Sequence, residues 1–134
     1  MARKSTEQPT DGELNILNVL WQRGPCRLSE VCEALNAQRP VAATTVATIL
    51  KIMSRKGQVE RVSDDEGIRW QAKLSQRQAG SHLIQRLVER VFEGSTRKLV
   101  LHLLEAGHLS AKEQQEISNL LVMRKQLRPT MKRR

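Results

Sequence analysis

The spacing of apolar residues predicts three helices in the first half of the chain. The first begins at a capping box over residues 10–13 and ends at Gly24-Pro25, because proline cannot continue a helix. We predict the second over residues 28–37 and the third over residues 41–56. The third helix ends at Gly57, since glycine readily adopts the left-handed conformation that closes a helix.

The third predicted helix has two contrasting faces. Its apolar stripe follows the helical repeat and consists of Val46, Ile49, Leu50 and Met53. At about 100° per residue the opposite face holds hydroxyls and cations without an acid. These residues are Thr44, Thr48, Lys51 and Arg55. Such a face suits DNA, where cations reach guanine edges or phosphates and threonines suit phosphate oxygens or a thymine methyl.

Two short strands follow, over residues 58–62 and 68–71, and the polar turn chemistry between them predicts a hairpin. Three helices followed by a hairpin is the order of a winged helix-turn-helix, whose third helix enters the major groove. Asp64, Asp65 and Glu66 place three acids at the hairpin tip, which phosphates repel. We therefore expect the hairpin mainly to pack, with limited phosphate contact through Arg61 and Arg69.

The second half of the chain is helical throughout, with predicted helices opening at Ser75, Thr96 and Ser110. Its apolar side chains exceed what three short helices can bury alone, so a two-fold partner is expected to cover them. The candidate dimerisation residues are Leu87, Val91, Leu99, Leu103, Leu104, Ile117, Leu120 and Leu121. The predicted architecture is mainly α with a small β-hairpin: a winged-helix DNA-binding domain (1–74), a three-helix dimerisation domain (75–128) and a basic tail (129–134).

The charge of the chain changes this prediction only slightly. A formal net charge of +9 favours a polyanion, with double-stranded DNA first and an anionic membrane second. Residues 1–74 hold 11 basic and 9 acidic residues, and residues 75–134 hold 12 and 5, so most of the excess lies outside the DNA-binding half. An aromatic content of 2% disfavours base-stacking modes of RNA or single-strand binding.

The sequence predicts neither catalysis nor a cofactor. It contains no nucleophile–base motif and no Gly-rich phosphate loop. Cys26 and Cys32 are interpreted as small buried hydrophobes of a reducing cytoplasm, and the three histidines lack metal-ligand spacing. The polar N-terminus and the absence of a long apolar run predict a cytoplasmic protein without a membrane partner.

Three sequence blocks resemble the BlaI/MecI/CopY (penicillinase repressor) family of winged-helix transcriptional repressors. They are DGELNILNVLW (11–21), TVATILKIMSRKG (45–57) and FEGSTRKLVLHLLE (92–105), the last of which belongs to the family's dimerisation region. The resemblance implies a homodimer that represses transcription from inverted repeats. By position, Thr45 matches the threonine usual in the third helix of this family.

The chain departs from the family at two functional places. His102 and Leu103 stand where β-lactam-responsive members have the Asn-Phe bond that is cleaved on induction. No cysteine follows Cys32, which excludes the copper-sensing cysteine tail of other members. The resemblance therefore implies release by an inducer or a protease that these residues do not identify.

Two other functions are compatible with parts of the pattern. A winged-helix adaptor that binds proteins would explain the acidic hairpin tip. A regulator that senses a small molecule would need a pocket, of which the sequence gives no sign. We predict a sequence-specific repressor that acts as a homodimer on a pseudo-palindromic operator.

Overall fold

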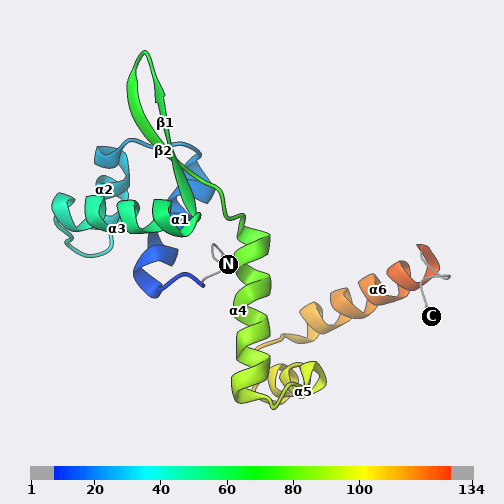
Figure 1. The fold of residues 1–134 in the computed structure, drawn as a ribbon. Helices are drawn as coiled ribbons and strands as arrows, with labels where there is room; N and C mark the ends of the chain where they lie inside the picture. Colours follow the sequence, from blue (N-terminus) through cyan, green and yellow to red (C-terminus); the bar gives the residue numbers. More distant parts are fainter. Residues whose placement is uncertain (1–7, 128–134) are drawn as a thin grey trace. The chain divides into compact units, whose positions relative to one another are not determined.

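The computed structural model describes residues 8–127 (Figure 1). Its elements, in chain order, are α1 (Asp11–Arg23), α2 (Leu28–Asn36), α3 (Ala43–Lys56), β1 (Val59–Asp64), β2 (Gly67–Ala72), α4 (Gln76–Val91), α5 (Thr96–Glu105) and α6 (Ala111–Leu127). This confirms the predicted class, mainly α with one hairpin, and the order of a winged helix-turn-helix. The predicted basic tail, 129–134, lies outside the described residues.

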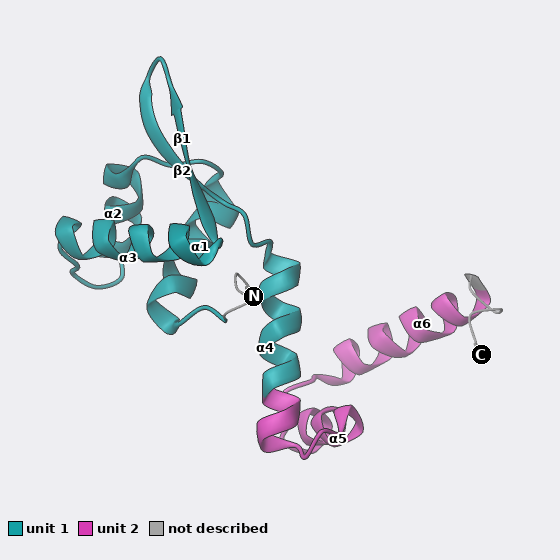
Figure 2. Ribbon diagram, in the orientation of Figure 1, with its two compact units in different colours: residues 1–86 teal, residues 87–134 magenta. Residues whose placement is uncertain are grey.

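The chain divides into two compact units, residues 1–86 and 87–134 (Figure 2). Their boundary falls inside α4, whereas the predicted functional boundary at residue 74 falls before it. The assignment of DNA binding to 1–74 and of dimerisation to 75–128 remains a prediction.

The core of the first unit lies between α1, α2, α3 and the base of the hairpin. Its most buried apolar side chains are Ile16, Leu17, Leu20, Val31, Val46, Leu50, Met53 and Val59. Trp21 and Trp70 pack against this cluster, and the Trp21 indole donates to the carbonyl of Leu74 at 2.9 Å. Both tryptophans are therefore partly buried packing residues.

The hairpin is antiparallel, with Val59 opposite Ala72 at its base and Asp64 opposite Gly67 at its tip. Cys26 forms a single antiparallel bridge to Trp70, so the segment between α1 and α2 also borders β2. The predicted strands are too short, because the turn comprises two residues instead of the five we expected. Gly67 takes a φ of 120°, and the Glu66 N–H donates to the Asp64 carboxylate at 2.8 Å, which permits the tighter turn.

α3 begins two residues later than predicted. The Asn36 side chain explains this: it accepts from the Val41 N–H at 2.9 Å and donates to the Val41 carbonyl at 3.2 Å. Ala42, the N-cap of α3, is extended, with φ −75° and ψ 146°.

Serine residues define the starts of the later helices. Ser75 and Gln78 form a reciprocal cap at α4, and Ser110 and Glu113 form another at α6. The Ser95 side chain accepts from the Lys98 N–H at α5. Within residues 8–127, no helix is long and apolar enough to cross a membrane.

Candidate nucleic-acid interface

The apolar face of α3 determines which of its side chains reach solvent. Val46, Leu50 and Met53 are fully buried against the core. The four α3 side chains predicted to contact DNA and the family-matched Thr45 are all exposed on the remaining arc of the helix. They are Thr44, Thr45, Thr48, Lys51 and Arg55. The structure therefore presents the predicted contact residues together on one element.

The threonines of this arc are not equivalent. The Thr48 hydroxyl donates to the Thr44 carbonyl at 2.9 Å, one helical turn earlier. Its proton is thus used within the helix, which leaves its methyl group and its lone pairs for a ligand. A shallow hollow of about 260 Å³ is lined by Thr44, Thr45, Thr48 and Ile49. Of the two roles the sequence left open for Thr48, contact with a thymine methyl fits this geometry better than donation to phosphate.

The electrostatics of α3 favour an anion at its N-terminal end and beside the exposed Lys51 and Arg55. The helix contains no acidic residue, and its last turn carries Arg55 and Lys56. Its N-cap residue, Ala42, provides no side-chain hydrogen bond to the first backbone N–H groups. Unpaired N–H groups and the helix dipole make this end attractive to phosphate, and the exposed Arg39 precedes it in the turn.

A partly buried ion pair joins the C-terminal end of α3 to α1. Lys56 Nζ donates to Glu13 Oε2 at 2.8 Å, and the Glu13 side chain is only 5% exposed. Burial raises the pKa of Glu13, but hydrogen bonds from Lys56 and from the Thr10 backbone outweigh burial, so the pKa is lowered overall. Local spacing predicted the bond of Glu13 to Thr10. The pairing with Lys56, distant in sequence, gave no local signal.

The two hairpin arginines have different surroundings. Arg69 lies 2.9 Å from the Asp64 carboxylate and 2.8 Å from that of Glu66. The hydrogen bond to Glu66 raises the pKa of Arg69, and the same bond lowers the pKa of Glu66. Arg61 is exposed and forms no ion pair within the described part of the chain. Of the two, Arg61 is thus the one whose charge is available to a phosphate.

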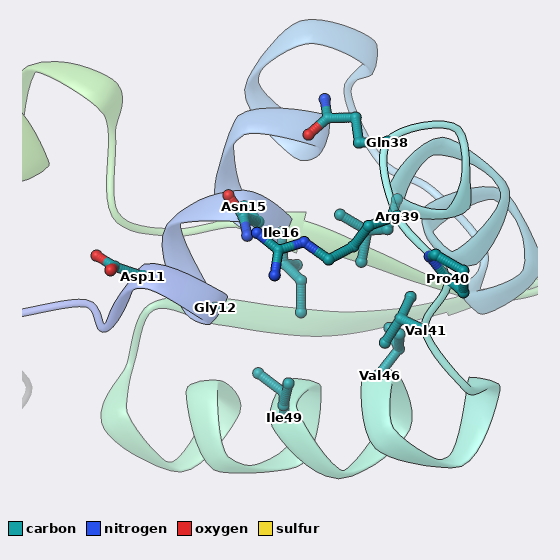
Figure 3. Close-up of a pocket in the computed structure, with 11 residues that line it drawn as sticks. Asp11, Gly12, Asn15, Ile16, Gln38, Arg39, Pro40, Val41, Val46 and Ile49 are labelled. Carbon is teal, nitrogen blue, oxygen red and sulfur yellow. The ribbon is translucent and has the colours of Figure 1, made fainter.

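A cleft of about 440 Å³ lies beside α3 in the same unit (Figure 3). In Figure 3, Arg39 extends from the turn before α3 toward Asn15 of α1, and Val46 and Ile49 line the α3 side. Ile49 also lines the hollow beside the threonines. The cleft therefore separates the start of α1 from the flank of the predicted DNA-contacting arc.

The second unit has little interior of its own. Among its described residues, Val88 is the only buried one, at 7% exposure. Leu99 and Leu103 of the predicted dimerisation set are half-buried, and the other six are exposed: Leu87, Val91, Leu104, Ile117, Leu120 and Leu121. Our prediction omitted further exposed apolar residues, namely Val100, Leu101, Val122 and Met123. A single-face helical template could not include Val122 and Met123, because α6 is apolar on more than one side.

The second unit also brings two histidines together. The rings of His102 and His108 are stacked with centroids 6.3 Å apart, and Phe92 meets His102 edge-on at 5.5 Å. Within the described residues, no group of three or more His, Cys, Asp or Glu side chains is placed to hold a metal ion. The bond between His102 and Leu103 lies inside α5.

Comparison with known proteins gives consistent matches over most of the chain. The family profile described as "Penicillinase repressor" matches residues 9–122. Methicillin resistance regulatory protein MecI of Mammaliicoccus sciuri is 22% identical over 116 residues, which cover 87% of this chain and 94% of MecI. The penicillinase repressor of Bacillus licheniformis is 22% identical over 118 residues, covering 88% and 92%.

Two further matches are more limited. Transcriptional regulator BlaI of Mycobacterium tuberculosis is 38% identical over 61 residues, 45% of this chain and 44% of BlaI. Among solved structures, a MarR family protein from Bacillus stearothermophilus superimposes with a TM-score of 0.49 at 19% identity. That superposition covers 85% of this chain and 79% of the other.

Proposed function

The chain belongs to the penicillinase repressor family, as its three sequence blocks predicted, and we propose that it represses transcription as a homodimer bound to a pseudo-palindromic operator. Membership in a family of transcriptional regulators also confirms the prediction of a regulator instead of an enzyme. In our proposal, two copies of α3 enter successive major grooves of duplex DNA, in the cytoplasm.

The exposed arc of α3 is the observation that carries this proposal. Lys51 and Arg55 are cations on a helix without acids, and Thr44, Thr45 and Thr48 are compact enough for close approach to base edges. Arg61 of the hairpin supplies a further charge for the DNA backbone. Arg69 contributes less, because Asp64 and Glu66 already bind its guanidinium.

The apolar surface of the second unit supports the homodimer. Leu120 and Leu121 of α6 are 57% and 63% exposed, and Val91 of α4 is 62% exposed. Monomeric proteins rarely expose so many large apolar side chains in one unit, and such exposure marks an interaction surface. A second copy of the chain offers the same surface, and two-fold dimers are the commonest oligomers.

Binding to selected DNA tests the proposal. A duplex enriched from a random pool by the full chain should carry an inverted repeat and bind far more tightly than a scrambled duplex. Lys51→Ala should cost about 1–3 kcal/mol of binding free energy and relax the preference at one position per half-site. Lys73→Ala, which removes an exposed lysine outside α3, is the matched control and should leave the preference unchanged.

The opposite result would favour the adaptor function. Weak binding that is equal for selected and scrambled duplexes, at all salt concentrations, would mean that α3 reads no sequence. A selected duplex without an inverted repeat would retain DNA binding but contradict the two-fold arrangement.

A further inference from the structure

One large exposed side chain of α3, Ile52, is not among the predicted DNA contacts. Ile52 is 38% exposed, whereas Leu50 and Met53 beside it are fully buried. Isolated exposed apolar residues are common on protein surfaces. The position of Ile52 is informative because it follows Lys51 and lies one turn beyond Thr48, about 40° around the helix from it.

Thr48 and Ile52 together make this part of the arc apolar. The Thr48 hydroxyl proton is bound to the Thr44 carbonyl at 2.9 Å, so Thr48 has no free donor. Ile52 has no polar group at all. A ligand here gains from an apolar contact, while Lys51 and Arg55 on the adjacent positions attract a polyanion.

One DNA base matches this combination. In the major groove, thymine presents a C5-methyl group, which no other standard base carries. We propose that Ile52, with the Thr48 methyl group beside it, recognises the C5-methyl of a thymine in each operator half-site. This inference rests on the proposed function, because it assumes that α3 occupies the major groove.

Deoxyuridine is the direct probe, because it differs from thymidine only by the missing methyl group. Each thymine of the selected operator is replaced in turn, and the affinity of the full chain is measured for each duplex. Burial of one methyl group predicts a loss of about fourfold at one position per half-site. The same position in Ile52→Ala should show a smaller loss, since only the Thr48 methyl group then remains beside the thymine.

Matched variants separate this contact from unspecific effects. Ile68→Ala removes a similarly exposed isoleucine (41%) from the hairpin and should keep the full deoxyuridine effect. Thr48→Ser removes the Thr48 methyl group but keeps the hydroxyl, and should therefore lose affinity. Circular dichroism confirms that each variant is folded.

The outcomes separate the role of Ile52 from the proposed repressor function on which it rests. Sequence-selective binding with no deoxyuridine-sensitive position, or with the same sensitivity in Ile52→Ala, overturns the role of Ile52 and leaves the repressor proposal intact. Absence of any sequence-selective binding overturns both.

Discussion

The two units of this chain obtain their order from different sources. In the first, Ile16, Leu17, Val31 and Leu50 are completely buried, and a partly buried ion pair joins α1 to α3. In the second, α5 and α6 have well-formed serine caps, yet Leu120 and Leu121 remain more than half exposed. Local capping is thus similar in both units, and tertiary burial is not.

This difference bears on how the protein is expected to work. A helix gains most of its stability from packing of its apolar face, so α5 and α6 need a surface that the second unit does not provide by itself. The first unit, in contrast, holds α3 in place with its own core. We therefore expect the stability of the second unit to depend on self-association. We expect α3 to keep its geometry in the monomer.

The largest expected effect follows from disrupting the apolar surface of α6. Leu121→Glu places a charge where a partner chain would bury a leucine, so the dimer should dissociate and operator affinity should fall about 100-fold or more. Gln115→Glu, which adds the same residue about 120° around α6 from Leu121, should change neither property. Sedimentation and operator titration measure the two effects, and a dimer that survives Leu121→Glu contradicts the assigned surface.

The core of the first unit provides the next test. Leu50→Ala should destabilise this unit by about 2–5 kcal/mol, because a fully buried side chain leaves a cavity. Ile52→Ala, two residues further along the same helix, should cost less than about 1 kcal/mol. Both tryptophans lie in this unit, so urea unfolding followed by tryptophan fluorescence reports on it selectively. Equal costs for the two variants would contradict the burial difference.

The elements that the sequence predicted well are those with strong local signals. The capping boxes at Thr10 and Ser110 and the C-cap at Gly57, which has a φ of 82°, are all present in the structure. The arc of α3 follows from helical periodicity alone, so its exposed residues can be identified from their spacing in the sequence.

The differences between prediction and structure come from interactions with distant or unexpected partners. Asn36 delays α3 by a side-chain bond to Val41, and Lys56 pairs with Glu13 across 43 residues, a contact that periodicity cannot reveal. Arg69 is predicted to make a limited phosphate contact beside the hairpin tip, but the tight turn brings two carboxylates to it. Ile52 was not predicted as a contact, because the face of α3 was defined by its polar residues.

A smaller effect is expected from the ion pair that joins α1 to α3. Glu13→Gln should cost about 1–3 kcal/mol near neutral pH, because Lys56 loses its charged partner. Since the folded-state pKa of Glu13 lies below its ordinary value of 4.5, its contribution is complete above that value and disappears as the pH falls through the folded pKa. The difference in urea midpoint between parent and variant should therefore shrink in acid. A difference that is constant with pH would mean that the Glu13 charge does not matter.

The smallest effect concerns the paired arginine of the hairpin. Arg69→Ala should lower operator affinity less than about threefold, because an exposed ion pair already occupies its guanidinium. The Asp64→Asn/Glu66→Gln double variant frees Arg69, so the salt dependence of binding should steepen by about one phosphate contact. Adding Arg69→Ala to that double variant should restore the parent slope, which separates a new arginine contact from the general loss of two negative charges. Arg69→Ala alone could instead reduce the salt dependence of the parent chain by one phosphate contact. That result would mean that Arg69 leaves Asp64 and Glu66 when DNA binds, so that the hairpin contacts DNA through Arg69 as well as Arg61.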